Sequence, residues 1–238
     1  MMADSKPRLR PVIAIDGPAG AGKSTLAAYL ARRFGFLNLE TGAMYRAFAL
    51  KALQNSAPLD DEAELMELAG STRIVLQPQQ REGNRVLLDG TDVTGRIRDK
   101  DVAEAASRVS VHGRVRAWMV GLQRALGAEG GVVMEGRDIG TKVFPDAEVK
   151  IFLDAEDVVR SQRRFFQNVA SAEASASVGP SQAEVLAGMR ERDARDRERA
   201  SSPLHPARDA VHLDSSSLTL EEVCSQAEAL VRSKIAGG

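Results

Sequence analysis

The stretch Gly17-Pro18-Ala19-Gly20-Ala21-Gly22-Lys23-Ser24 decides the fold of this chain. It follows an apolar run, Val12-Ile13-Ala14-Ile15, and precedes a segment from Thr25 to Phe34 whose apolar residues recur at helical spacing. The spacing of its glycines, lysine and serine is that of a phosphate-binding loop, the P-loop. A strand, this loop and a helix in succession predict the first unit of a parallel α/β sheet, with the site beyond the carboxyl ends of the strands.

The chemistry of this loop indicates a nucleoside triphosphate as its ligand. The glycines can adopt positive φ, so that successive backbone N–H groups point into one concavity. The first turn of the following helix adds further N–H donors and the positive end of its dipole. Lys23 is expected to reach the β- and γ-phosphates, and the Ser24 hydroxyl to be a ligand for Mg²⁺. The residues predicted to bind the nucleotide are Gly17, Pro18, Ala19, Gly20, Ala21, Gly22, Lys23, Ser24 and Thr25.

Composition and charge restrict the class of protein. The 238 residues carry a formal net charge of −1 and 4% aromatic residues, which argues against a nucleic-acid partner. The lone Cys224 excludes an intrachain disulfide framework and suits a reducing compartment. The first ten residues lack the apolar core of a signal peptide, and no apolar run approaches membrane-spanning length. We therefore expect a cytoplasmic monomer that binds no membrane.

Apolar strands alternate with helices along the rest of the chain, which predicts a parallel sheet with helices on both faces. Further strands are expected at 36–39, 132–135, 148–153 and 210–213. Helices are expected to end at Leu53 and to span 99–111, 114–126, 157–166, 181–199 and 219–235. Residues 59–97 differ from this alternation and predict an inserted helix-and-hairpin unit. The pattern consists of an acidic helix over 59–68, two β-rich runs at 72–76 and 85–88, and a turn at 89–92. The Ala/Ser-rich residues 170–180 are expected to form a mobile turn.

Arginines gather in three places that an anionic acceptor could use. Arg46 follows Thr41-Gly42 at a strand-to-helix junction, and Arg137 follows another strand. The third place is the charged helix over 190–199, where Arg192, Asp196 and Arg199 share one face. A solvated, salt-bridged surface is the usual interpretation of each feature alone. Together with Arg160 and Arg164 across the Ala/Ser turn, the charged helix predicts a lid that closes over phosphates and expels water.

At this point the chain resembles the bacterial cytidylate kinases, a group of nucleoside monophosphate kinases, from about Pro11 to the C-terminal helix. The segments that carry the resemblance are 15–25, 41–46, 135–141, 144–147, 150–155, 191–196 and 212–216. The combination of the P-loop with Gly136-Arg137-Asp138-x-Gly140-Thr141 and Glu191-Arg192-Asp193-x-Arg195-Asp196 is highly specific. The unit at 59–97 also resembles the monophosphate-binding insertion of this group.

The resemblance implies a division of the chain and a role for particular residues. It implies one domain over 11–238, with a core at 11–40, 98–155 and 203–238, a monophosphate-binding region at 41–97 and a lid at 156–202. Arg46, Arg137 and Arg199 would hold the acceptor α-phosphate, together with Thr41 at the acceptor site, and Ser107, Arg116 and Asp138 would contact the cytosine edge. Arg192 and Asp196 would lie at the acceptor, with Asp196 accepting from the ribose hydroxyls, and the lid residues Arg160 and Arg164 would reach the transferred phosphoryl group. Lys23, Arg160, Arg164 and Arg192 are the implied catalytic residues. Glu135 stands where aspartate is frequent in the group, which leaves its reach toward Mg²⁺ open.

The expected reaction is ATP + (d)CMP → ADP + (d)CDP, with Mg²⁺ as cofactor, in pyrimidine nucleotide metabolism. It needs no dedicated general base, because the acceptor phosphate is already largely dianionic near neutral pH. Two alternatives stay open at the level of the sequence. One is another small-molecule P-loop kinase of the shikimate or gluconate type, and the other is a non-enzymatic ATP-binding switch.

Overall fold

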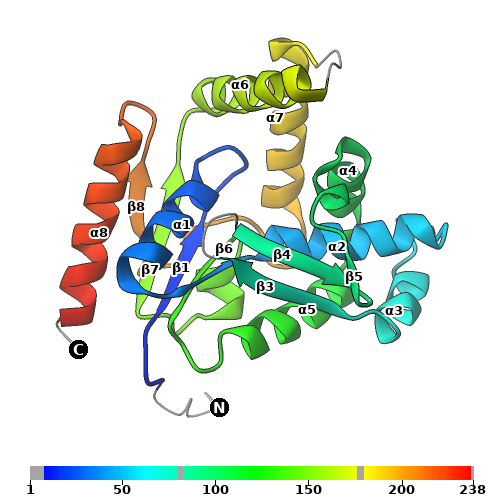
Figure 1. The fold of residues 1–238 in the computed structure, drawn as a ribbon, viewed down its shortest axis with the longest axis horizontal. Coiled ribbons are helices and arrows are strands. Elements are labelled where there is room, and N and C mark those ends of the chain that lie inside the picture. The colour runs from blue at the N-terminus through cyan, green and yellow to red at the C-terminus, as the bar shows by residue number, and fades with distance from the viewer. Residues whose placement is uncertain (1–7, 80–82, 176–179, 237–238) are drawn as a thin grey trace.

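The computed structural model describes residues 8–79, 83–175 and 180–236. Its main sheet has five strands in the order β2-β6-β1-β7-β8, all parallel (Figure 1). The strands are β1 (Val12–Asp16), β2 (Leu37–Glu40), β6 (Val132–Gly136), β7 (Val149–Asp154) and β8 (Val211–Asp214). The strands expected from the sequence are thus confirmed to within one or two residues.

The two faces of this sheet are covered by different helices, because successive side chains of a strand point to opposite sides. Val12 and Ala14 of β1 pack into one apolar cluster, which includes residues of α2, α4 and α5. Ile13 and Ile15 pack into the other, with residues of α1 and α8. The bounds of these helices are α1 (Lys23–Phe34), α2 (Thr41–Gln54), α4 (Lys100–Val109), α5 (Gly113–Leu126) and α8 (Leu220–Ala236). The predicted α/β fold is confirmed.

The unit inserted before α4 contains a helix and a small antiparallel sheet. It consists of α3 (Glu62–Gly70), β3 (Ile74–Gln79), β4 (Gly83–Leu88), β5 (Thr91–Asp92) and the 3₁₀ turn η1 (Arg96–Arg98). The predicted turn is tighter than expected, because Asp89 and Gly90 both adopt positive φ and Thr91–Asp92 returns as a strand against β4. Buried Asn84 ties this unit to β2: its side-chain amide donates to Asn38 O at 2.7 Å and accepts from the Glu40 N–H at 3.0 Å.

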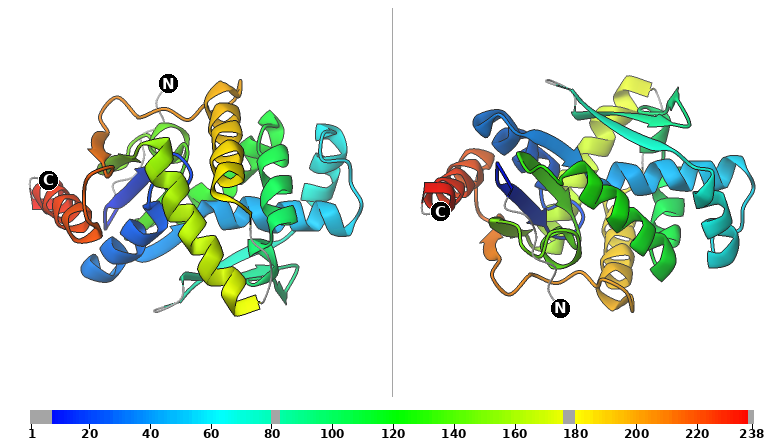
Figure 2. Two further views of the ribbon diagram at one scale, coloured as in Figure 1. Left: turned by 90° about the horizontal axis from the view of Figure 1, so that it is seen from above. Right: turned by 90° about the horizontal axis from the view of Figure 1, so that it is seen from below.

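Two helices, α6 (Asp157–Ser175) and α7 (Gln182–Glu198), lie over the end of the sheet next to the P-loop (Figures 1 and 2). The prediction that helix ends at 166 was wrong: α6 continues to Ser175, through most of the stretch assigned to a turn, because alanine is the strongest helix former. Residues 176–179, the rest of that predicted turn, lie outside the described residues. α7 begins with a capping box between Ser181 and Glu184.

A π-helical turn, Ile139–Val143 (η2), follows β6 and was not predicted from the sequence. It is fixed by Asp16 at the end of β1, whose carboxylate accepts the N–H groups of Ile139 at 2.8 Å and Gly140 at 2.7 Å. Burial raises the pKa of Asp16 to about 6. This link joins the P-loop strand to the segment that carries Arg137 and Asp138. Among the described helices, none has the length and apolar character needed to cross a membrane.

Candidate active site

The P-loop occupies the junction of β1 and α1, where its backbone conformation depends on glycine. Gly17 has φ of +149°, and a Cβ at this position would lie 1.9 Å from Leu153 O. Gly22, with φ of +96°, is the N-cap of α1. Lys23 begins the helix, is 6% exposed, and donates to Pro18 O at 2.7 Å. The lysine is therefore folded back along the loop, as expected for a side chain that reaches phosphates held by that loop.

Ser24 and Glu135 together form an oxygen-rich site beside Lys23. The Ser24 hydroxyl donates to Glu135 Oε1 at 2.6 Å, across 111 residues of sequence. Burial raises the pKa of Glu135, and the nearby Glu40 carboxylate adds to this effect. A hydroxyl and a carboxylate are hard oxygen donors, which is what Mg²⁺ prefers when phosphates supply further ligands. The residues present thus fit the predicted Mg²⁺ site, with the Glu135 carboxylate in hydrogen-bond contact with the Ser24 hydroxyl.

Positive charge is concentrated around this point from several elements. Lys23 of α1 is joined by Arg46 of α2, Arg137 after β6, Arg164 of α6 and Arg192 of α7. Burial, with Arg137 and Arg192 nearby, lowers the pKa of Lys23 to about 7. Burial and the neighbouring arginines also lower the pKa of Arg192, to about 10. Among the described residues Arg164 and Arg192 form no ion pair, so the cluster has an excess of cations that an anionic ligand would neutralise.

A second group of largely buried polar side chains comes from α2, α5 and the segments that follow β6 and α7. The Arg116 guanidinium donates to Asp138 Oδ2 at 2.6 Å, and both side chains are almost completely buried. The same guanidinium lies 5.5 Å from the centre of the Tyr45 ring. Among the residues that the structure describes, the buried atoms Tyr45 Oη, Arg116 Nε and Arg199 Nη2 have no hydrogen-bond partner. Unpaired buried polar groups are rare in folded proteins, so these atoms indicate a pocket built for a polar ligand.

Asp196 lies between the cationic cluster and the group of polar side chains around Asp138. Its carboxylate accepts from Arg137 Nε at 2.9 Å and from Arg199 Nη1 at 3.3 Å. Burial alone would raise the pKa of Asp196, but Arg137, Arg192 and Arg199 outweigh it and hold that pKa below its usual value. Asp196 is therefore a charged acceptor fixed between the cationic cluster and the pocket around Asp138.

Comparison with known proteins assigns the chain to a family. The family model described as cytidylate kinase matches residues 13–233. A cytidylate kinase of Solibacter usitatus is 47% identical over 237 residues, covering 100% of this chain and 98% of that protein. Those of Mannheimia succiniciproducens and Actinobacillus succinogenes are each 46% identical, covering 94% of this chain and 97% and 100% of theirs.

The chain belongs to the cytidylate kinase family. It is accordingly an ATP-dependent nucleoside monophosphate kinase and a transferase. Family membership separates it from the shikimate or gluconate type of kinase and from a non-enzymatic switch. The structure brings the residues implied by this resemblance to one end of the sheet, on elements that are far apart in the sequence.

Two of those residues make contacts that the sequence did not indicate. Arg160 is 3% exposed, and its guanidinium donates to Asp193 Oδ2 at 2.6 Å, to Ala19 O at 3.0 Å and to Ala155 O at 2.7 Å. It thereby joins the lid to the P-loop. Thr41 is also buried, and its hydroxyl donates to Glu135 O at 2.7 Å, which fixes the start of α2 against β6.

Two further residues of the site had no role assigned from the sequence. Tyr45 lies against Arg116, and burial raises its pKa to about 12, so it remains a neutral hydroxyl. Arg195 of α7 donates to the Ser107 hydroxyl of α4 at 2.9 Å. Tyr45 stands in a quoted motif directly before Arg46, and that adjacency was the available signal. Arg195 likewise stands in a motif of the resemblance, directly before Asp196, and the same adjacency was its available signal.

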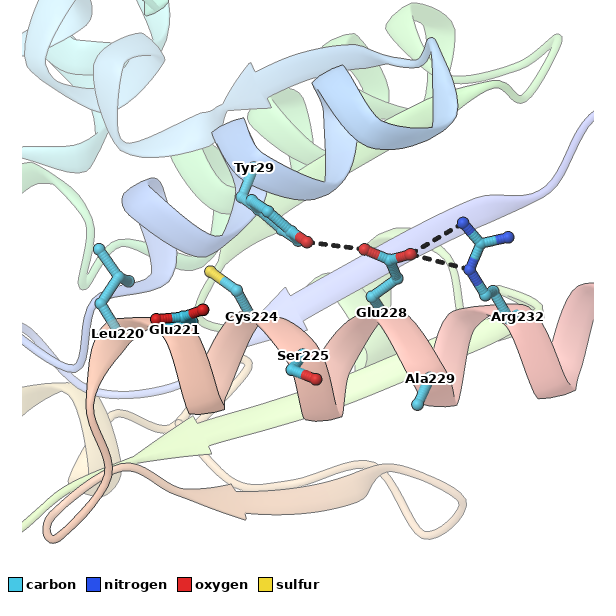
Figure 3. Close-up of a pocket in the computed structure, with 8 residues that line it drawn as sticks. All are labelled: Tyr29, Leu220, Glu221, Cys224, Ser225, Glu228, Ala229 and Arg232. Atoms are coloured by element: carbon cyan, nitrogen blue, oxygen red, sulfur yellow. Dashed lines mark hydrogen bonds and ion pairs between the residues drawn. The ribbon is translucent and has the colours of Figure 1, made fainter.

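A separate groove of about 750 Å³ lies between α1 and α8 (Figure 3). Figure 3 shows Tyr29 and Arg232 directed toward Glu228, which accepts from them at 2.6 and 2.8 Å. Cys224 lines the same groove, and burial raises the pKa of its thiol, consistent with a packing role. Within this groove Glu228 pairs with Tyr29 and Arg232, and none of its lining residues belongs to the site described above.

Proposed function

We propose that this member of the cytidylate kinase family transfers the γ-phosphoryl group of ATP to CMP and dCMP, giving CDP and dCDP, at the site around Lys23 and Asp138. The observation that carries this assignment is the excess of cations from five separate elements beside a pocket with unpaired buried donors. A triphosphate beside a monophosphate supplies the missing negative charge, and a polar base supplies acceptors for the unpaired donors.

On the donor side, we assign the triphosphate to the backbone of Gly17–Thr25 and to the Lys23 ammonium group. Ser24 and Glu135 would hold Mg²⁺, directly or through water, because their oxygens are already within hydrogen-bond distance of each other. Mg²⁺ held by these residues would supply positive charge against the negative charge that develops during transfer. Lys23 adds a positive charge, because the negative phosphates raise the pKa of its side chain and so favour the ammonium form.

On the acceptor side, we assign the α-phosphate of CMP to Arg46, Arg137 and Arg199. The base would contact Ser107, Arg116 and Asp138, with the Asp138 carboxylate accepting from the exocyclic amino group of cytosine and repelling the carbonyl of uracil. Arg192 and Asp196 would lie beside the sugar, with Asp196 accepting from its hydroxyls. Thr41 would act at this site through the hydrogen bond that its hydroxyl donates to Glu135 O.

The reaction follows from position and charge. The acceptor phosphate, with a second pKa of about 6, attacks as a dianion and needs no general base. Arg164 and Arg192, which have no carboxylate partner among the described residues, are placed to stabilise the transferred group once the lid 156–202 closes over the region 41–97. Arg160 supports this closure from the side of the P-loop. We also propose a monomer, acting in the cytoplasm.

The test is a coupled assay of ADP release with Mg-ATP against CMP, dCMP, UMP, AMP, GMP and shikimate. Turnover confined mainly to CMP and dCMP is expected, since a carboxylate at the base edge penalises a carbonyl there. Arg46→Met and Arg33→Met form a matched pair: Arg46 lies in the cationic cluster, whereas Arg33 is half exposed and pairs with Glu228. Loss of CMP turnover in both variants, or strong turnover of another acceptor, would contradict the assignment.

A further inference from the structure

Arg195 forms a direct link between the lid and the pocket proposed for the base. It lies on α7, and its Nη1 donates to Ser107 Oγ of α4 at 2.9 Å, across 88 residues of sequence. Its Nη2 donates to Glu191, one helical turn earlier. Figures 1 and 2 show α7 standing between the sheet and α4, and this contact joins α7 to α4.

The contact with Arg195 also determines which hydrogen-bonding positions of the Ser107 hydroxyl remain free for a ligand. A serine hydroxyl has one donor and two acceptor positions, and the guanidinium of Arg195 occupies one acceptor position. The hydroxyl proton of buried Ser107 remains available to donate into the pocket. Cytosine carries a ring nitrogen and a carbonyl oxygen that accept such a bond.

Closure of α7 over an empty pocket is energetically costly. Within the described part of the chain, Arg195 Nε is buried without a partner, as are Arg199 Nη2 at the C-cap of α7 and Arg116 Nε on α5. An unpaired buried donor destabilises the conformation that buries it. A ligand that supplies acceptors to these donors removes the cost only when α7 is closed, so its binding energy favours the closed lid.

We propose that Arg195 is a positioning residue that couples occupation of the base pocket to closure of the lid, through its bond to Ser107. This inference rests on the proposed function, which places the acceptor base at Ser107. Coupling between two sites is reciprocal, so a lid held closed also strengthens binding of the acceptor nucleotide.

The variant Arg195→Met keeps an unbranched apolar stem and removes every donor. We expect it to raise the KM for CMP about tenfold, which corresponds to one charged hydrogen bond, with a smaller change in kcat. Arg197→Met is the matched control, because Arg197 lies two residues further along α7 and is exposed. The double variant Arg195→Met/Ser107→Ala should have a KM close to that of the worse single variant, because both changes break the same link.

Hydrogen exchange separates coupling from simple loss of affinity. In the unmodified protein, CMP without ATP should slow amide exchange in α4 and α5, which line the pocket, and also in α7. In Arg195→Met at saturating CMP, exchange in α4 and α5 should still slow, whereas exchange in α7 should match that of the ligand-free variant. Arg197→Met should behave as the unmodified protein.

Two outcomes would overturn the inference. One is slowing of exchange in α7 of Arg195→Met to the same extent as in the unmodified protein. The other is a fold-increase in the KM of the double variant that equals the product of the fold-increases in the two single variants. Failure of the proposed function has a different signature: CMP would then leave α4 and α5 of the unmodified protein unaffected.

Discussion

Lys23 lies where burial and neighbouring positive charge both disfavour its ammonium form. Arg137 and Arg192 contribute to this effect, and the pKa of Lys23 falls to about 7. A bound triphosphate reverses the balance, because it brings negative charge to the same buried position. In the free protein Lys23 is therefore partly deprotonated near neutral pH, and nucleotide binding favours its protonated form.

We expect Mg-ATP binding at pH 8 to take up close to one proton. A pKa of about 7 leaves most Lys23 neutral at pH 8 in the free protein, and the phosphates raise that pKa in the complex. The affinity for ATP should accordingly fall as pH rises from 7 to 9. Titration calorimetry in two buffers of different ionisation enthalpy measures the uptake. Lys23→Arg is the control, since arginine stays charged; equal uptake in both proteins would refute the prediction.

Gly17 provides a second prediction at this scale. We expect Gly17→Ala to lower the free energy of unfolding by at least about 3 kcal/mol and to abolish ATP binding, because its Cβ would overlap Leu153 O. Gly35→Ala is the matched control: Gly35 also has positive φ, but nothing lies within 4 Å of its Cβ position, so it should cost about 1 kcal/mol. Denaturant unfolding measures both changes, and equal costs would contradict the steric argument.

Among the elements, α6 and α7 are joined by ion pairs of contrasting environment. Arg160 and Asp193 are both 4% exposed and lie against the P-loop. Arg190 and Asp157 also join α6 to α7, at 2.6 Å, but are 59% and 36% exposed. Met189 contacts Gly20 from the same side, so the buried pair forms part of a direct contact between lid and P-loop.

We expect Asp193→Ala to lower the free energy of unfolding by about 3–5 kcal/mol, because it leaves the buried Arg160 guanidinium without its carboxylate. Asp157→Ala, which removes the exposed pair between the same two helices, should cost less than about 1 kcal/mol. Urea unfolding monitored by circular dichroism compares the two variants. Similar costs would mean that Arg160 finds compensation elsewhere and that the buried pair does not hold the lid in place.

At the scale of the whole molecule, the site forms where three parts of the chain converge. The sheet provides the P-loop, Glu135 and Arg137; the segment after β2 provides Arg46; and the lid provides Arg192 and Asp196. Asn84 ties the inserted unit to β2, Asp16 ties β1 to η2, and Arg160 ties the lid to the P-loop. These buried links set the relative positions of groups that no single element brings together.

The sequence by itself determined the parallel sheet and the position of the site at its carboxyl edge. Alternating strands and helices and the glycine spacing of the P-loop are local patterns, and local backbone preferences are enough to produce them. It also indicated Arg46 and Arg137, which follow strands, and Asp196, on a charged helix, as members of one site, and the resemblance added Asp138. The length of α6 was misjudged because a low-complexity Ala/Ser stretch suits both a helix and a turn.

Only the tertiary structure decided how the charged side chains pair. Arg137 with Asp196, Arg160 with Asp193 and Arg195 with Ser107 join residues far apart in the sequence. In a helix as rich in charges of both signs as α7, the sequence does not show which arginine contacts a carboxylate, a hydroxyl or the phosphate of a ligand. That choice depends on which neighbouring elements pack against each face of the helix, because burial penalises every charge that finds no partner there.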